Sequence, residues 1–158
     1  MSRWRVWPKE FTLSATDTFL AQLPYLHPQF CDGNVSPATS SYNCIAWAAS
    51  ETAAWWEPHP DYYWPDGVLR AYSLPAYIAA FQTRGFQLCA DASLEPGIEK
   101  IVLYEINGFP THAARQLTSG SWTSKLGDFE DIQHADLVCL QGPLYGTARI
   151  YMKRNLPE

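Results

Sequence analysis

Clusters of basic residues are scarce in this sequence, and so are long apolar runs. Eleven Lys and Arg residues stand against 16 Asp and Glu residues, which gives a formal net charge of −5. Nucleic acids bind to basic surfaces, so we expect no nucleic-acid partner. A helix that spans a bilayer needs about 20 consecutive apolar residues. Because no segment approaches that length, we expect no membrane partner either.

Signals for export and for metal binding are also missing. Residues 1–8 contain no apolar segment of the kind found in signal peptides, and Pro8 interrupts them. The four cysteines, at positions 31, 44, 89 and 139, form no CxxC pair, so their spacing favours neither a zinc site nor a redox pair. We therefore expect reduced thiols, no metal and no cofactor in a cytoplasmic protein. An effector exported without a cleavable signal would have the same features.

What the sequence does contain is typical of a packed domain. Hydrophobic residues make up 47%, aromatic residues 15% and charged residues only 17% of the chain. A chain of this length buries roughly 70% of its unfolded surface. No linker, repeat or low-complexity segment divides it, so we expect residues 1–158 to form a single domain.

The order of the hydrophobic patterns predicts helices first and strands second. Helical patterns with capping residues cover residues 18–23, 43–54 and 73–85, and residues 24–40 form a loop. Strand patterns follow at residues 86–89, 100–106, 110–117, 121–126 and 145–153, with a helical turn around residues 131–140. Asn107-Gly108 is typical of a type I′ hairpin. This order predicts an α+β fold in which the 43–54 helix packs on a C-terminal antiparallel sheet.

Cys44 and His112 are the residues on which a functional prediction depends. Cys44 follows a helix-capping asparagine, so the helix dipole and the free N–H groups of the first turn favour its thiolate. His112 begins a later strand. An imidazole within hydrogen-bond reach of the thiol would serve as its general base. The alternative is a buried structural cysteine and an ordinary strand histidine.

A third polar residue is expected on the next strand, where the segment 122–127 reads Trp-Thr-Ser-Lys-Leu-Gly. Ser124 is our first candidate to orient the imidazole and fix its tautomer, and His134 is the second. Lys125 would repel an imidazolium, so we assign it to substrate binding or to a carboxylate partner. An edge strand with solvated polar residues is the alternative for the whole segment.

Donors for an oxyanion and a wall for a substrate cleft complete the predicted site. The backbone N–H of Cys44 is one donor, and the Asn43 amide or the Tyr42 hydroxyl would add a second. Asn43 is equally suited to be a helix N-cap. Aromatic side chains near the site are predicted to contact the substrate, although tryptophans also pack ordinary cores. They are Trp47, Trp56, Trp64 and Trp122.

Four blocks of the sequence resemble those of an uncharacterised bacterial domain family. They are YNCIAWA (42–48), THAARQL (111–117), WTSKLG (122–127) and DIQH (131–134). A cysteine that opens a helix, a histidine that opens a strand and a polar residue on the next strand resemble the papain-like superfamily. The closest likeness is to the compact bacterial branch with cell-wall peptidases and amidases.

This resemblance implies a papain-like fold with Cys44 as nucleophile and His112 as base. The third member of the superfamily's site is usually His, Asn, Gln or Asp, so Ser124 departs from the pattern. The oxyanion glutamine of papain-type enzymes has no clear counterpart, because Gln29 lies far upstream of the cysteine.

The sequence thus predicts a thiol hydrolase or acyltransferase that acts on a peptide, isopeptide or side-chain amide bond. Its partner would be a peptide or protein substrate. The alternative is a non-catalytic binding domain on the same fold, such as an immunity or accessory protein.

Overall fold

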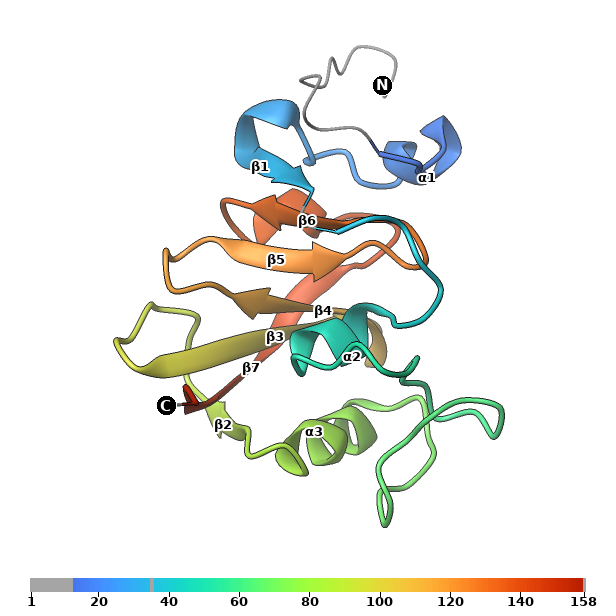
Figure 1. Cartoon of the computed structure of the whole chain (residues 1–158), viewed down its shortest axis with the longest axis vertical. Helices are drawn as coiled ribbons and strands as arrows, with labels where there is room; N and C mark the ends of the chain where they lie inside the picture. The colour runs from blue at the N-terminus through green and yellow to red at the C-terminus, as the bar shows by residue number, and fades with distance from the viewer. Residues whose placement is uncertain (1–12, 35, 158) are drawn as a thin grey trace.

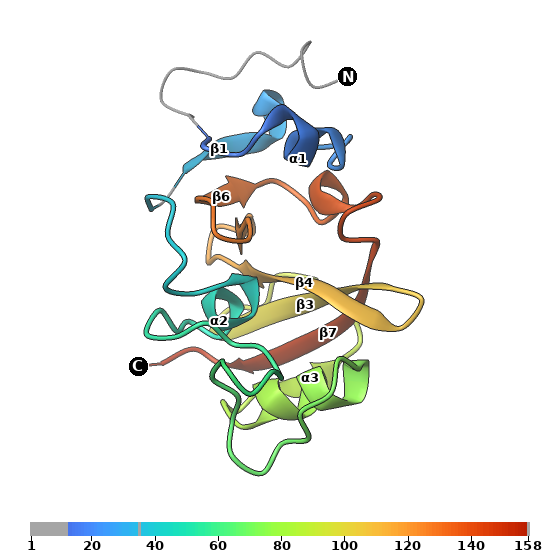
Figure 2. The same cartoon turned by 90° about the vertical axis from the view of Figure 1, so that its right-hand side faces the viewer.

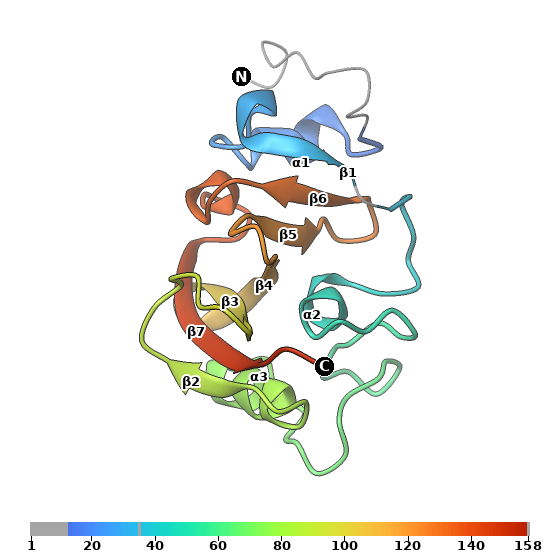
Figure 3. The same ribbon diagram turned by 60° about the vertical axis from the view of Figure 1, so that its left-hand side comes forward.

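A computed structural model describes residues 13–34 and 36–157, so the expectation about residues 1–8 lies outside the described residues. The fold is α+β, with one seven-stranded sheet in the order β1-β6-β5-β4-β3-β7-β2. Figure 3 shows this order from β1 at the top to β2 at the bottom. The strands are β1 (Cys31–Asn34), β2 (Gln87–Cys89), β3 (Ile98–Ile106), β4 (Phe109–Gln116), β5 (Trp122–Lys125), β6 (Asp131–His134) and β7 (Thr147–Asn155).

All paired strands run antiparallel. The four strands from β3 to β6 follow one another as a meander, and β7 returns to lie beside β3. Asn107 and Gly108 join β3 to β4 with φ of 50° and 83°. Positive φ at both central positions defines a type I′ turn, so this prediction is confirmed.

In the residues that the structure describes, three α-helices accompany the sheet (Figure 1), and a polar side chain caps each N-terminus. They are α1 (Asp17–Ala21), α2 (Cys44–Ala48) and α3 (Leu74–Gln82). Helix α2 ends well before residue 54 because Ser50 adopts a left-handed φ of 63°. The N–H of Glu51 then bonds to the carbonyl of Ala46, and the N–H of Ser50 to that of Trp47, which is a Schellman ending.

Two further sequence-based expectations about secondary structure are wrong. Residues 131–134 form strand β6 instead of a helical turn, because their backbone pairs with β5 from Trp122↔His134 to Lys125↔Asp131. Only Val138–Leu140 forms a 3-10 helix in that region. The expected loop over residues 24–40 contains β1 and a short 3-10 helix, Pro28–Phe30.

Hydrophobic clusters cover both faces of the sheet. The first cluster joins α2 and α3 to Ile101, Leu103 and Ala113. The second contains residues of α1 with Val102 and Ala114. Neighbouring residues of one strand fall into different clusters because successive side chains point to opposite faces. Figure 2 shows α2 beside β3 and β4, and α1 at the far end near β1. Among the described residues, no helix has the length and apolarity to cross a bilayer.

Candidate functional site

Cys44 is the first residue of α2 and lies against the middle of the sheet. Its thiol is hydrogen-bonded by the backbone N–H groups of Ala113 in β4 and of Ile45. Burial raises the pKa of this thiol to about 11, although these bonds and the positive charge of Lys125 act in the opposite direction. The sequence predicts a lowered pKa at this position, and that prediction is wrong because desolvation outweighs the favourable contacts.

His112 is completely buried, and within the described part of the chain neither of its ring nitrogens has a hydrogen-bond partner. The ring stacks on Tyr145 at 4.1 Å between centroids and 21° between planes, and meets Tyr104 edge-on at 5.4 Å. Burial and the charge of His134 hold the pKa of His112 well below its usual value. A buried polar group without a partner costs about 1–3 kcal/mol, so this imidazole is an unusual feature of the core.

No hydrogen bond joins the thiol of Cys44 to the ring of His112. The ring contacts tyrosines of the second cluster, whereas the thiol packs against the first. A β-bulge lies next to His112: Tyr104 pairs with His112 and Glu105 with Pro110, so Thr111 is left over. The roles of Cys44 as nucleophile and His112 as base therefore stay predictions.

Ser124 and His134 form a hydrogen bond with each other and not with His112. Ser124 Oγ lies 2.8 Å from His134 Nε2, and His134 Nδ1 lies 2.8 Å from the carbonyl oxygen of Asp136. A carbonyl only accepts, so Nδ1 carries the proton and Nε2 accepts from the Ser124 hydroxyl. Both side chains are fully buried, and burial lowers the pKa of His134 to about 4. The pair satisfies its own polar groups, and no bond from it reaches His112.

The predicted oxyanion residues are engaged in structural contacts. Asn43 Oδ1 accepts from the N–H groups of Ala46 and Trp56, and its Nδ2 donates to the Trp56 carbonyl. Asn43 is therefore the N-cap of α2, the alternative considered from sequence. The Tyr42 hydroxyl lies 3.5 Å from Asp131 Oδ2 and its ring stacks on Trp47.

The predicted substrate contacts mostly lie in the interior. Trp56, Trp64 and Trp122 are between 2% and 4% exposed and belong to the two clusters. Trp47 is partly buried, and its indole N–H donates to Thr123 Oγ1.

Lys125 is also fully buried, with its ammonium 2.7 Å from the Thr39 carbonyl and 2.5 Å from that of Gly127. It holds the segment that precedes α2. Burial lowers its pKa. Its positive charge is nevertheless close enough to lower the pKa of Cys44.

Tyr145 and Tyr77 are neighbours of the thiol that sequence reasoning missed. Burial raises the pKa of both, and the negative charge that Cys44 would carry raises each further. Tyr145 thus contacts the ring of His112 and also lies within electrostatic range of the Cys44 sulfur. The sequence signal that could have drawn attention to Tyr145 is its place in the segment from Gly142 to Gly146, where a glycine lies on either side of the aromatic residue.

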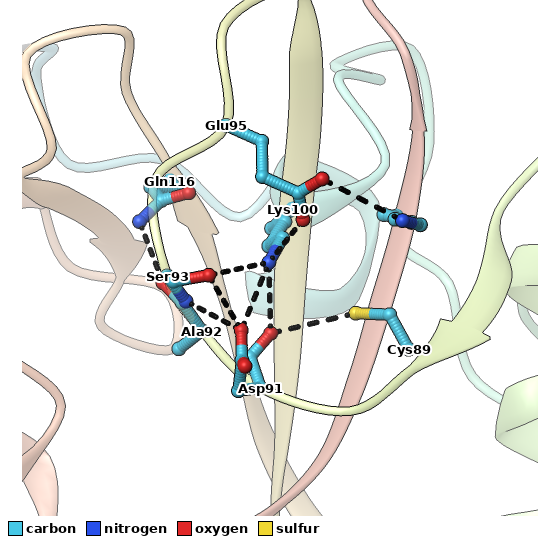
Figure 4. A network of polar contacts seen from close by, with 8 residues as sticks. Cys89, Asp91, Ala92, Ser93, Glu95, Lys100 and Gln116 are labelled. Atoms are coloured by element: carbon cyan, nitrogen blue, oxygen red, sulfur yellow. Dashed lines mark hydrogen bonds and ion pairs between the residues drawn. The ribbon is translucent and has the colours of Figure 1, made fainter.

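A separate polar network surrounds Lys100, whose side chain is 1% exposed (Figure 4). Its ammonium lies 2.7 Å from Glu95 Oε2 and 3.2 Å from Asp91 Oδ1, and it also donates to the Asp91 carbonyl and Ser93 Oγ. Gln116 Nε2 donates to the Ala92 carbonyl nearby. These contacts fasten the loop before β3 to the sheet.

Within the residues that the structure describes, no group of three or more His, Cys, Asp or Glu side chains is placed to hold a metal.

Comparison with known proteins relates the chain to one family. Neither the curated proteins nor the solved structures include a match to the chain. Residues 33–153, which span most of the sheet and all of α2 and α3, match a family described as a domain of unknown function. The chain therefore belongs to the DUF7689 family.

Proposed function

We propose that this domain is a thiol hydrolase or acyltransferase of papain-like design, which acts on peptide, isopeptide or side-chain amide bonds. Cys44 is the nucleophile and His112 the general base. Support comes from the helix that begins at Cys44 and packs on an antiparallel sheet whose strand β4 carries His112. The order of these elements matches that of the superfamily.

The observation that carries the proposal is the imidazole of His112, buried with two unpaired nitrogens. It directly precedes Ala113, whose amide bonds the thiol, but alternation along β4 points the imidazole to the opposite face, so the proposal requires β4 to change its register. Selection for stability alone would replace such a side chain with an apolar one, because its polar atoms cost free energy without forming a bond. On this proposal, His112 is kept in the core because it serves as the general base of Cys44.

The reaction follows from these groups. The Cys44 sulfur attacks the carbonyl carbon, and His112 takes the thiol proton. The amine leaves with that proton as the carbon–nitrogen bond breaks, which gives a thioester on Cys44. Water, or an acceptor amine, then attacks the thioester and regenerates the thiol. The amide N–H groups of the first turn of α2 lie beside the sulfur and are suited to stabilise the oxyanion.

The proposal is tested with p-nitrophenyl acetate, an activated acyl donor that does not require knowledge of the substrate. We expect p-nitrophenolate release and an acetyl group on Cys44 by mass spectrometry. Cys44→Ala should abolish acylation at this position, and His112→Ala should slow it by about 10²–10⁴-fold, the usual contribution of a general base. Cys89→Ala is the matched control, because Cys89 is also partly buried. Equal release from Cys44→Ala and the wild type would refute the proposal.

A binding domain is the second candidate, and one surface favours it. The guanidinium of Arg84 lies 4.9 Å from the Trp56 ring and donates to the Tyr63 hydroxyl, beside a cleft of about 160 Å³. Glu51 lines the same cleft and pairs with Arg84 at 3.0 Å. Absence of acylation at Cys44, together with partner binding that is lost in Tyr63→Ala, would favour this function.

A further inference from the structure

The carboxylate of Glu57 joins two pairs of aromatic rings at the surface. Its Oε1 accepts from the indole N–H of Trp55 at 3.1 Å, and its Oε2 accepts from the hydroxyl of Tyr72 at 2.5 Å. This second bond raises the pKa of Tyr72 to about 12. The ring of Tyr62 lies 6.1 Å from that of Trp55 between centroids. Phe109 stacks on Tyr72 at 5.6 Å, with 4° between the planes. These residues form the Glu57 cluster.

The backbone fixes the Glu57 cluster at an exposed position. The N–H of Glu57 bonds to the carbonyl of Tyr63 at 3.0 Å, and the N–H of Tyr63 bonds to the carbonyl of Trp55 at 3.1 Å. Three of the rings are well exposed, with fractions of 44% for Tyr62, 40% for Tyr72 and 51% for Phe109. Large apolar side chains that are exposed side by side are typical of interaction surfaces. The cluster is therefore suited to contact a partner.

The chain itself contains a filled example of the same arrangement. The guanidinium of Arg84 pairs with Glu51 at 3.0 Å, lies 4.9 Å from the Trp56 ring and donates to the Tyr63 hydroxyl. By contrast, no Lys, Arg or His side chain among the described residues forms an ion pair with Glu57. The Glu57 cluster thus offers rings and a carboxylate, the two kinds of contact that a guanidinium uses.

We propose that the Glu57 cluster binds an arginine side chain of a partner peptide or protein. Each carboxylate oxygen has a second lone pair, so Glu57 can accept from a guanidinium while it keeps its bonds to Trp55 and Tyr72. The planar cation stacks on the exposed face of a neighbouring ring. The formal net charge of −5 also favours a basic partner. This site uses no thiol chemistry and is independent of the proposed hydrolase.

The site is tested with a short peptide, acetyl-Gly-Arg-Gly-amide, at low ionic strength. Its citrulline analogue has nearly the same shape but no charge, and a lysine analogue has a charge that is not planar. Binding is followed by NMR at the indole N–H of Trp55, which contacts Glu57. We expect the arginine peptide to bind about tenfold more tightly than the citrulline peptide, because a cation–π contact and an exposed ion pair together contribute about that factor. The lysine peptide should bind a few-fold more weakly than the arginine peptide, since an ammonium does not stack in the same way.

Variants separate the carboxylate and the rings. Glu57→Gln should reduce the affinity for the arginine peptide to that of the citrulline peptide. Phe109→Ala removes an exposed ring outside the core and should weaken binding a few-fold. Asp61→Asn is the matched control, because it removes the same charge from the same loop at a side chain that is 80% exposed, and it should retain the wild-type affinity. Equal affinities for the arginine and citrulline peptides, or equal losses in Glu57→Gln and Asp61→Asn, would overturn the site. Lysine that binds as tightly as arginine would overturn the assignment to a guanidinium.

Discussion

Acidification is expected to destabilise this protein through its buried, neutral histidines, and His134 allows the effect to be calculated. Burial lowers the pKa of His134 from 6.5 to about 4, while the unfolded chain keeps the ordinary value. The folded state therefore resists protonation at a pH where the unfolded state accepts a proton. Stability from this residue is complete above about pH 6.5 and is lost as the pH falls towards 4.

The magnitude follows from the shift. A difference of about 2.5 pKa units corresponds to about 3 kcal/mol, because one unit is worth roughly 1.4 kcal/mol. Most of this loss occurs above pH 4.5. A domain of this kind has only about 5–15 kcal/mol of total stability, so the change is large enough to measure by urea unfolding.

The matched variant is His134→Gln, which offers an acceptor to Ser124 and a donor to the Asp136 carbonyl but has no titratable group. The wild type should lose about 2.5 kcal/mol relative to this variant between pH 7.5 and 4.5. His112 is buried in both proteins, so the part of its contribution that comes from burial cancels in the difference, whereas the smaller part that comes from the charge of His134 does not. A difference in unfolding free energy that stays constant across this range would refute the assignment of a depressed pKa to His134.

Three further predictions concern single contacts. Asn43→Ala removes a helix cap and should lower the unfolding free energy in urea by about 2 kcal/mol or more. Lys100→Met should raise the pKa of Asp91 only part of the way from about 2 towards 3.8, as followed by NMR titration, because the hydrogen bonds from Ser93 make the largest contribution to the shift. Gly146→Ala should destabilise strongly in thermal unfolding, because its Cβ would lie 2.0 Å from a backbone oxygen, whereas Gly67→Ala, with a similar φ and open space, is the milder control.

The sequence predicts the α+β class, most of the strands that follow α3 and the β3–β4 hairpin, but not β1, which precedes α2. Asn107-Gly108 enforces its turn, and Ser73 and Asn43 cap their helices as short polar side chains do. The end of α2 was not predictable, because it depends on a left-handed serine at position 50. Serine carries no strong preference for that conformation, unlike glycine.

Which polar side chains meet depends on strand register. This explains why Ser124 and His134 of the predicted site come together, whereas Cys44 and His112 do not. Ser124 and Lys125 are adjacent in sequence, but alternation along β5 sends them to opposite faces. Ser124 meets His134 on the face of the second cluster, whereas Lys125 bonds to the segment before α2. The bulge at Thr111 has a similar effect on β4, since one extra residue decides on which side His112 lies. Because a slip by one residue moves every side chain of a strand to the other face, the register of β4 keeps the imidazole on the face opposite to the thiol of Cys44.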